Sequence, residues 1–449
     1  MYINSISIRN LKLLRDVEIP LTRGSEPRMW TVLVGENGLC KTSILQAIAL
    51  AALGADSANA FPEIIPSLPD RRKPGNPVEI RAEFGFGTVR HTKRTYPGFD
   101  SLPAHPPRLI SRVALAPGWT FFSGDSDYLG PAIDQVDGQA GREPDEKTNP
   151  VRQARGTGLP YWFVAGYGTV RSLPLPRSVE GIIAPTTDRL ASLFDRGSIV
   201  GTGFADLLKT KKLVGEYVTV LQHALLDQKG ILPAINRLEL RGKGGVKSAK
   251  QLVESHRFDF VAGGEEVRLP ATWLSHGYQA TISWISDLVG QMFWEAQEKV
   301  SLDQMEGLVL IDELDLHLHP LWQVGLIRAL KQTFPRVQFV ATTHSPMLLP
   351  GLERDEIWHA RLEGGNVQVE MFDQSPALMT GSELYQTFFG IDRLYPADLG
   401  EALYRYGYLA SDPRRSDEAN TEMQRLHKHL VESGVEPGLV PVSREDERE

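Results

Sequence analysis

The chain has 449 residues, of which 41% are hydrophobic and 23% charged, so it can bury a sizeable core in two or three domains or in one elaborated α/β domain. Its formal net charge of −8 confines any contact with nucleic acid to a local basic patch, and its single cysteine excludes an internal disulfide framework and fits a reducing compartment. The first residues alternate too much for a signal peptide, and no run of about 18 apolar residues occurs, so we expect a cytoplasmic protein without a membrane segment.

The start of the chain predicts strands, then a tight loop, then a helix. Met1–Leu21 alternates apolar and polar residues as two short strands would. The β-prone run Trp30–Val34 enters a glycine-containing turn at 35–40, and Lys41-Thr42-Ser43 opens a run of helix formers that ends near Gly54. A strand, a glycine-containing loop and a helix in this order are the setting of a phosphate-binding loop, with an ordinary strand-to-helix turn as the alternative.

This loop has the chemistry to bind a nucleotide. Backbone N–H groups in the turn and the N-terminus of the following helix attract phosphate. Lys41 can reach the β- and γ-phosphates, and Thr42 can place its hydroxyl on Mg²⁺. The loop departs from the pattern G-x-x-x-x-G-K-[ST] because Cys40 stands where the second glycine belongs. The predicted nucleotide-binding residues are Gly35, Glu36, Asn37, Gly38, Leu39, Cys40, Lys41, Thr42 and Ser43.

The middle of the chain predicts strands, insertions and a helical lobe. Val78–Phe86 alternates like a strand, whereas Pro103–Pro150 is dense in glycine and proline and predicts a surface insertion within a larger inserted region, about 57–160. Leu159–Val170 predicts a buried strand, and helical spacing over about 185–255 predicts a small helical lobe. A basic group in this lobe fits a solvated face or, as the sharper alternative, a DNA-facing surface. Its members are Lys209, Lys211, Lys212, Arg241, Lys243, Lys247 and Lys250.

The second half of the chain alternates strands and helices. Phe258–Val267 predicts a hairpin, and Ala280–Trp294 predicts a long apolar helix. Buried strands are predicted at Gly307–Ile311 and Val337–Thr342, joined by a helix at Pro320–Thr333. This alternation indicates an α/β fold with a largely parallel central sheet. The apolar residues that we expect on one side of the joining helix are Leu321, Val324, Ile327 and Leu330.

Polar residues follow the two buried strands. Asp312, at the C-terminal end of its strand, can hold Mg²⁺ opposite Thr42, and Glu313 can polarise the water that attacks a γ-phosphate. A solvated acidic turn is the alternative, which the matching phosphate loop makes the weaker one. His344, at the end of the next strand, can bond to the γ-phosphate and the water, or it can be an ordinary turn histidine.

Two further groups allow a functional and an ordinary interpretation. Ser275-His276-Gly277 can be a common helix cap, or its hydroxyl and helix N-terminus can clamp a γ-phosphate held by another subunit. His317 and His319 have the spacing of a metal pair, but without cysteines or further ligands we do not expect zinc.

The stretches GENGLCKT, LSHGYQ, LVLIDELDLHLHP and ATTHSP, in this order, resemble the ABC-type ATPase heads of the SMC, RecF and OLD-like families, and most closely the PtuA-like ATPases of anti-phage defence systems. The resemblance implies an ABC-type P-loop NTPase head with a mostly parallel central sheet, an antiparallel β lobe and a helical lobe. It also implies that ATP and Mg²⁺ are sandwiched between the two heads of a homodimer.

The resemblance implies a role for each motif residue. It assigns Lys41 to phosphate, Thr42 and Asp312 to Mg²⁺, Glu313 to water activation and His344 to sensing of the γ-phosphate. The clamp acting from the partner head is implied for Ser275 and Gly277, and Asp315 is implied to lie in the D-loop at the dimer interface. Arg9 and Lys12 fall where related heads often contact nucleotide. The glutamine of the Q-loop stays open among Gln135, Gln139 and Gln153.

We expect an ATPase head over 1–350 and a mostly helical extension over 351–449, which opens with a strand at Val367–Phe372. The extension has neither the Asp-x-Asp of a Toprim nuclease nor a His-Asn-His pattern, so we expect the ATPase subunit alone. The leading interpretation is a nucleotide-gated dimer that senses nucleic acid or controls a separate effector nuclease in phage defence. A RecF-like DNA repair ATPase is one alternative. A transporter ATPase fits less well, because 231 positions (274 − 43) separate the phosphate loop from the LSHGYQ stretch.

Cys40 carries two expectations of its own. If its position needs a positive φ, the loop is strained and turnover is slow, so a nucleotide-gated scaffold with little hydrolysis is a second alternative. A thiol at a helix N-terminus beside Lys41 also predicts a depressed pKa and a reactive cysteine when the site is empty.

Overall fold

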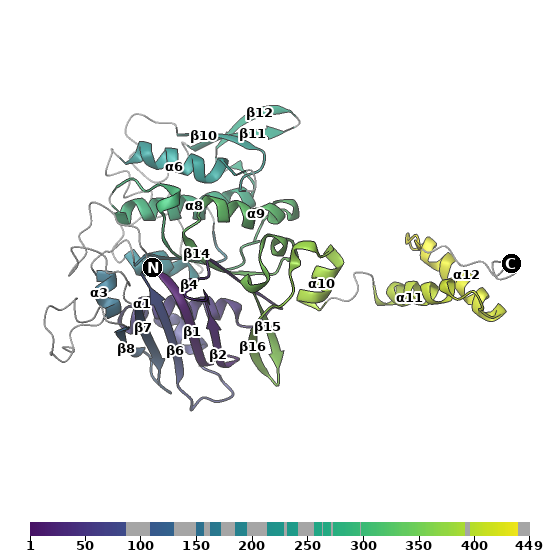
Figure 1. Cartoon of the computed structure of the whole chain (residues 1–449), viewed down its shortest axis with the longest axis horizontal. Coiled ribbons are helices and arrows are strands. Elements are labelled where there is room, and N and C mark those ends of the chain that lie inside the picture. The colour runs from purple at the N-terminus through teal and green to yellow at the C-terminus, as the bar shows by residue number, and fades with distance from the viewer. Residues whose placement is uncertain are drawn as a thin grey trace. The chain divides into compact units, whose positions relative to one another are not determined.

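The computed structural model of the chain describes residues 1–86, 108–129, 150–156, 162–171, 185–194, 213–228, 231–240, 256–262, 264–270, 273–296, 298–390 and 396–438 (Figure 1). The chain divides into two compact units, Met1–Leu378 and Met379–Glu449. This division lies 28 residues (378 − 350) beyond the one that we expected at 350, because the strands after 350 join the central sheet of the first unit.

A six-stranded sheet forms the centre of the first unit. Its strands are β5 (Trp30–Val34), β9 (Val164–Tyr167), β13 (Gly307–Ile311), β14 (Val337–Thr343), β15 (Ile357–Glu363) and β16 (Asn366–Met371). The order is β16-β15-β5-β14-β13-β9, and each pair is parallel except β15 with β16. The strands β5, β9, β13 and β14 are buried along their whole length, as continuous apolar runs require. The predicted fold class, α/β with a mostly parallel sheet, is confirmed.

An antiparallel sheet forms a lobe beside it. Its strands are β1 (Tyr2–Leu11), β2 (Leu14–Pro20), β6 (Val78–Gly85), β7 (Arg108–Leu115) and β8 (Ser123–Leu129), in the order β2-β1-β6-β7-β8. The expectation that Pro103–Pro150 is only a surface insertion is therefore wrong for its described part, since two strands of this sheet lie there. The expected inserted region likewise contains β6, a full member of the sheet.

Helix α1 (Lys41–Ala58) packs against strands of both sheets. It continues past Gly54, the expected end, where a positive φ of 69° kinks it. The shorter elements of the first unit are the hairpin β3 (Thr22–Arg23) and β4 (Glu26–Pro27), η1 (Pro62–Ser67), α3 (Pro150–Gly156), η4 (Leu302–Gln304), η5 (Pro346–Gly351), η6 (Arg354–Glu356) and η7 (Pro376–Leu378).

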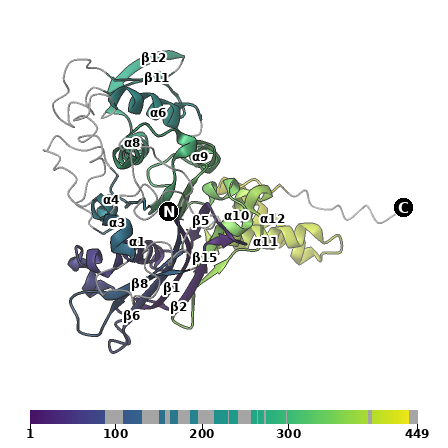
Figure 2. The same ribbon diagram turned by 60° about the vertical axis from the view of Figure 1, so that its left-hand side comes forward.

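The helical lobe expected over about 185–255 contains the helices α4 (Pro185–Leu190), η2 (Ala191–Leu193) and α6 (Val214–Leu226), and also the first strand of a small sheet. The helices α8 (His276–Ala296) and α9 (Pro320–Thr333) follow it in the chain. The strands β10 (Ile235–Leu240), β11 (His256–Ala262) and β12 (Glu265–Pro270) form an antiparallel sheet, in which β11 and β12 are the predicted hairpin. Helix α6 lies between α8 and this sheet (Figure 2). The predicted basic group at 209–250 lies outside the described residues.

Helix α9 shows where the expected apolar side was wrong. Ile327 and Leu330 are buried, but Leu321 and Val324 are 78% and 48% exposed. Both exposed residues lie off the buried side of the helix, because that side is formed by Gln323, Leu326, Ile327 and Leu330.

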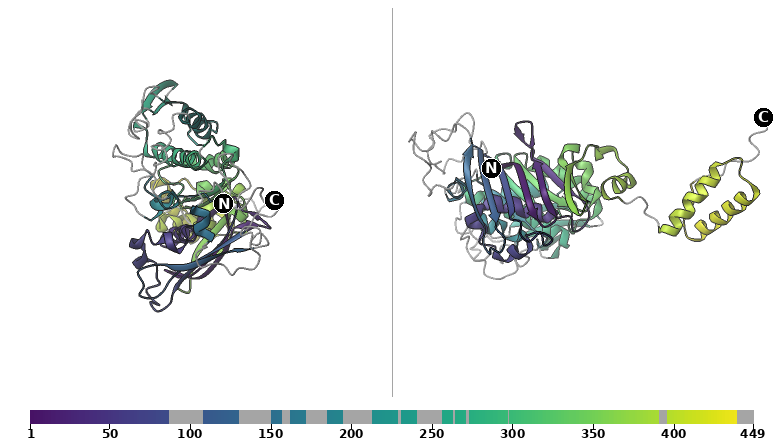
Figure 3. Two further views of the ribbon diagram at one scale, coloured as in Figure 1. Left: turned by 90° about the vertical axis from the view of Figure 1, so that its left-hand side faces the viewer. Right: turned by 90° about the horizontal axis from the view of Figure 1, so that it is seen from below.

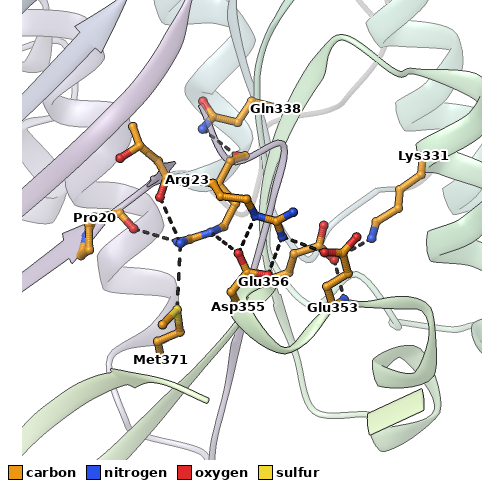
Figure 4. A network of polar contacts seen from close by, with 10 residues as sticks. Pro20, Arg23, Lys331, Gln338, Glu353, Asp355, Glu356 and Met371 are labelled. Carbon is orange, nitrogen blue, oxygen red and sulfur yellow. Dashed lines mark hydrogen bonds and ion pairs between the residues drawn. The ribbon is translucent and has the colours of Figure 1, made fainter. Parts of the chain in front are cut away.

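A buried polar joint connects the two large sheets (Figure 4). Gln338 on β14 is fully buried, and its amide nitrogen donates to the carbonyls of Ile3 and Arg28, both at 2.9 Å. Its amide oxygen accepts the N–H of Ile3 at 2.7 Å. The Arg28 guanidinium donates to the Pro20 carbonyl at 2.9 Å and lies 3.6 Å from the Asp355 carboxylate. Because buried amides must be paired, this joint fixes β1 relative to β14.

Side chains occupy the outer edge of β9, the last strand of the central sheet. Arg189 Nε donates to the Val164 carbonyl at 3.1 Å, and Ser192 Oγ donates to the Gly166 carbonyl at 2.7 Å. The same hydroxyl accepts the N–H of Gly168 at 3.2 Å. A Cβ on Gly168 would lie 2.0 Å from the Ser192 carbonyl oxygen, so only glycine fits this close approach.

The second unit consists of α10 (Gly381–Phe389), α11 (Ala397–Ser411) and α12 (Asp417–Glu432), in agreement with the helices expected there. Helices α11 and α12 pack side by side through a small apolar core of Tyr406, Met423 and Leu430 (Figure 3). In the described part of the chain, none of the helices combines the length and apolarity that crossing a membrane requires.

Candidate nucleotide-binding site

The loop between β5 and α1 adopts a conformation that its glycines make possible. Gly35 has φ 145° and lies so close to β15 that a Cβ would meet the Ala360 carbonyl oxygen at 2.6 Å. Gly38 has φ 82°. Cys40, the residue before the helix, has φ 56° and ψ 18°, so the position of the missing glycine does take the left-handed conformation. A residue with a Cβ is strained there.

The Lys41 side chain is folded into this loop. It is 5% exposed, and its ammonium donates to the carbonyls of Gly35 at 2.8 Å and Glu36 at 2.7 Å. Burial lowers the pKa of Lys41 to about 8, although Asp312 and Glu313 act in the opposite direction. The ammonium is thus held by two backbone carbonyls of the loop, at the cavity that a phosphate would enter.

Thr42 and Asp312 meet at the ends of α1 and β13. The Thr42 hydroxyl lies 3.0 and 2.9 Å from the two carboxylate oxygens of Asp312. The Thr342 hydroxyl, on the neighbouring strand β14, donates to the same carboxylate at 2.7 Å. A hydroxyl and a carboxylate are hard oxygen ligands, and Mg²⁺ completes its shell with phosphate oxygens and water, so this pair fits the expected metal.

The turn after β13 is held by β14. Glu313 has a positive φ of 49°, and its N–H donates to the Thr342 hydroxyl at 2.7 Å. Asp315 accepts hydrogen bonds from the Thr343 hydroxyl at 2.5 Å and from the His344 N–H at 3.3 Å. Since β13 and β14 are parallel neighbours, the residues that follow them lie at the same edge of the sheet.

These residues surround one cavity of about 390 Å³. Burial, followed by the charge of Lys41, lowers the pKa of His344, so its imidazole is neutral at pH 7. The cavity is lined by Lys12, Asn37, Gly38, Leu39, Cys40, Lys41, Thr42, Ser43, Asp312, Glu313, Thr342 and His344. Most of the predicted site residues are therefore brought together, while Gly35 and Glu36 contribute their carbonyls to Lys41.

Ser275 and Gly277 are not among the residues that line this cavity. They stand on either side of His276, the first residue of α8. A Cβ on Gly277 would lie 2.5 Å from the His317 carbonyl oxygen, so the start of α8 packs closely on the loop after β13. Tyr278 extends this contact by packing edge-on against Trp322 of α9, with ring centroids 4.1 Å apart.

The expectation of a depressed Cys40 pKa is wrong. The thiol is buried, and burial raises its pKa more than a hydrogen bond with the Leu13 backbone and the charges of Lys12 and Lys41 lower it. Lys12 does lie at the cavity, where it donates to the Ser43 hydroxyl at 2.8 Å, whereas Arg9 is paired with Asp16 on the lobe surface. Sequence reasoning missed Thr342, because its contact with Asp312 depends on strand register.

The other candidates have ordinary positions. His319 caps α9 by accepting the N–H of Leu321, and in the described ranges no group of three or more His, Cys, Asp or Glu side chains is placed to hold a metal ion. Gln135 and Gln139 lie outside the described residues, and the side chain of Gln153 is not described, so the Q-loop stays open.

Two family models match the chain at the segments that build this site. Residues 1–93 match "AAA ATPase domain", and residues 218–349 match "AAA domain, putative AbiEii toxin, Type IV TA system". With the cavity and the sheet around it, these matches define the class that the chain resembles: both segments that build the site are similar to AAA-type ATPase domains.

The predicted resemblance to PtuA-like proteins is confirmed. The chain is 27% identical over 433 residues to the Septu protein PtuA of Bacillus mycoides (strain KBAB4), which covers 96% of this chain and 50% of that protein. It is 36% identical over 100 residues to the Retron Ec83 probable ATPase of Escherichia coli, over 22% of this chain and 18% of that one. The chain thus spans half of the first relative and less of the second. An SMC head domain from Thermotoga maritima aligns with 83% of this chain and all of its own, at 14% identity and a TM-score of 0.42.

Proposed function

We propose that the chain binds ATP with Mg²⁺ and hydrolyses it. The observation that carries this proposal is the contact of the Thr42 hydroxyl with the Asp312 carboxylate, beside Lys41, Glu313 and His344 in one cavity. Thr42 and Asp312 would hold the ion, which supplies charge neutralisation on the β- and γ-phosphates when bound. Glu313 accepts a hydrogen bond from the attacking water and orients it, and the neutral imidazole of His344 bonds to the γ-phosphate.

We propose that two copies of the chain enclose the nucleotide. Ser275 and Gly277 belong to the motif set but line no part of their own cavity, which supports a role at the cavity of a partner copy. The N-terminus of α8, a helix of 21 residues, would direct its backbone N–H groups at the γ-phosphate there. Asp315, in the turn between Glu313 and α9, would lie at the same interface.

The relatives support a biological setting for this ATPase. The likeness to a Septu PtuA protein and to a retron ATPase supports a role in anti-phage defence. In that setting, nucleotide binding and hydrolysis would control a separate effector nuclease in response to nucleic acid. A nucleotide-gated scaffold with slow hydrolysis is the second candidate, favoured by the left-handed backbone of Cys40 in the loop that must close on phosphate.

ATP turnover by the purified chain, with and without DNA, tests the chemistry. We expect Lys41→Ala to abolish ATP binding, and Glu313→Gln to retain binding while it lowers kcat by at least about 100-fold. Glu313→Gln should also trap ATP-dependent dimers in size-exclusion chromatography. Glu363→Gln, at an exposed carboxylate on β15, is the matched control and should behave as the native protein. Tight Lys41-dependent binding without turnover would favour the scaffold, and absence of both would refute the proposal.

Mixing two inactive variants tests the shared site. A dimer of one Lys41→Ala copy and one Ser275→Arg copy has one intact composite site, because the two intact motifs face each other across one nucleotide. With random pairing and independent sites, an equal mixture should recover about a quarter of native turnover. If Ser275 served the cavity of its own chain, the mixture would stay inactive.

A further inference from the structure

Arg171 lies behind the acidic turn and takes no part in the site described above. It follows β9, the strand that pairs with β13 so that the Tyr167 carbonyl accepts the N–H of Asp312 at 2.9 Å. The Arg171 side chain is only 4% exposed. Burying a guanidinium is costly unless carboxylates or carbonyls surround it, so a buried arginine at this point needs a reason.

The contacts of Arg171 point to the backbone of Glu313. Its Nη2 donates to the Glu313 carbonyl oxygen at 2.5 Å, while its Nε has no hydrogen-bond partner. Burial lowers the pKa of Arg171 to about 10, against the opposing charges of Asp312, Asp315 and Glu313, so the guanidinium is charged at neutral pH. Arg171 is absent from the lining of the nucleotide cavity, and its hydrogen bond goes to the main chain of the turn.

Glu313 needs such support because its backbone is strained. A positive φ costs a residue with a Cβ about 1–3 kcal/mol, and it persists only where the surroundings hold it. Three contacts hold the Glu313 backbone: its N–H donates to the Thr342 hydroxyl, and its carbonyl accepts from Arg171 and from the N–H of Leu316 at 2.9 Å. Arg171 supplies the one side-chain donor to this carbonyl among the described residues. The orientation of the Glu313 carboxylate at the cavity depends on this conformation.

We propose that Arg171 is a positioning residue for Glu313. It fixes the left-handed backbone of Glu313 and so aims the carboxylate at the attacking water, without touching the nucleotide. The effect on hydrolysis rests on the proposed ATPase function, whereas the effect on the Glu313 backbone does not.

The test compares Arg171→Met and Arg171→Lys with the native chain. Arg28→Met is the matched control, because Arg28 is also buried and donates to backbone carbonyls, those of Pro20 and Thr22, and none of these three residues lines the cavity. We expect Arg171→Met to lower kcat by about 10- to 100-fold with KM for ATP within about twofold, and Arg171→Lys, which keeps one donor, to fall between. The double variant Arg171→Met, Glu313→Gln should have the same turnover as Glu313→Gln alone, because Arg171 acts through Glu313.

Amide hydrogen exchange of the segment 307–318 gives a readout that needs no turnover. Exchange should be faster in Arg171→Met than in the native chain and unchanged in Arg28→Met. Native exchange in Arg171→Met would overturn the proposal, as would a parallel loss of ATP affinity or an effect additive with Glu313→Gln. The two proposals can also fail separately. If the native chain hydrolyses no ATP but exchange is faster in Arg171→Met, the ATPase function is refuted, while the proposal that Arg171 fixes the Glu313 backbone is supported.

Discussion

Replacing Cys40 with glycine or alanine measures the strain in the phosphate-binding loop. The left-handed conformation of Cys40 costs a residue with a Cβ about 1–2 kcal/mol and costs glycine nothing. Glycine loses about 0.5–1 kcal/mol through its freedom in the unfolded chain, and the buried thiol is worth about 1 kcal/mol. Cys40→Gly should therefore stay within about 1 kcal/mol of the native free energy of unfolding. Cys40→Ala keeps the strain, loses the sulfur and should lie about 1 kcal/mol lower.

Thermal unfolding of the three proteins without nucleotide is the assay. Over the 378 residues of the first unit, 1 kcal/mol corresponds to about 1 °C in Tm. Gly215→Ala is the control of opposite sign: Gly215 lies in helix α6 with open space around its Cβ position, so alanine should be the more stable residue there. An alanine at position 40 that matches or exceeds glycine in Tm would refute the reasoning that this backbone is strained.

Three further predictions follow from burial and charge. Because the pKa of Lys41 is about 8, its ammonium deprotonates above that pH, and ATP affinity measured by fluorescent-nucleotide titration should fall by up to about tenfold per pH unit from pH 8 to 9.5; a flat profile would contradict this. Iodoacetamide should alkylate Cys40 at pH 7.5 at least about tenfold more slowly than a cysteine peptide, since burial raises its pKa, and an equal rate would show that the thiol is accessible. Gln338→Leu leaves buried amide groups unpaired and should lower the free energy of unfolding by about 2–4 kcal/mol in denaturant titrations, whereas the exposed Gln368→Leu should change it by less than about 0.5 kcal/mol.

The parallel sheet could be predicted because burial on both faces leaves a simple pattern. Gly307–Ile311 is a continuous apolar run, Val337–Thr343 is a largely apolar one, and both are fully buried strands. The strands β7 and β8 could not be predicted, because their membership of the antiparallel sheet depends on pairing with β6 and with each other inside a segment rich in glycine and proline. The exposure of Leu321 shows the same limit, since the local pattern of apolar residues did not show that the polar Gln323 belongs to the buried side of α9.

The candidate site was also predicted only in part. Motif spacing predicted that Lys41, Thr42, Asp312, Glu313 and His344 would meet, and they line one cavity, while their roles stay predictions. The supporting contacts could not be predicted, because each depends on the register of neighbouring strands. The pKa of the Cys40 thiol was missed for another reason: local sequence shows the helix N-terminus and the lysine but not the depth of burial, which here has the larger effect.

The side chains on the outer edge of β9 have a consequence for assembly. An edge strand normally presents free carbonyl and N–H groups, to which a strand of another molecule can add. Here Arg189 and Ser192 already occupy the carbonyls of Val164 and Gly166 and the N–H of Gly168. A foreign strand would have to displace a buried arginine and break these bonds before it could pair. The sheet is therefore closed to extension at this edge, which protects the chain from edge-to-edge aggregation there.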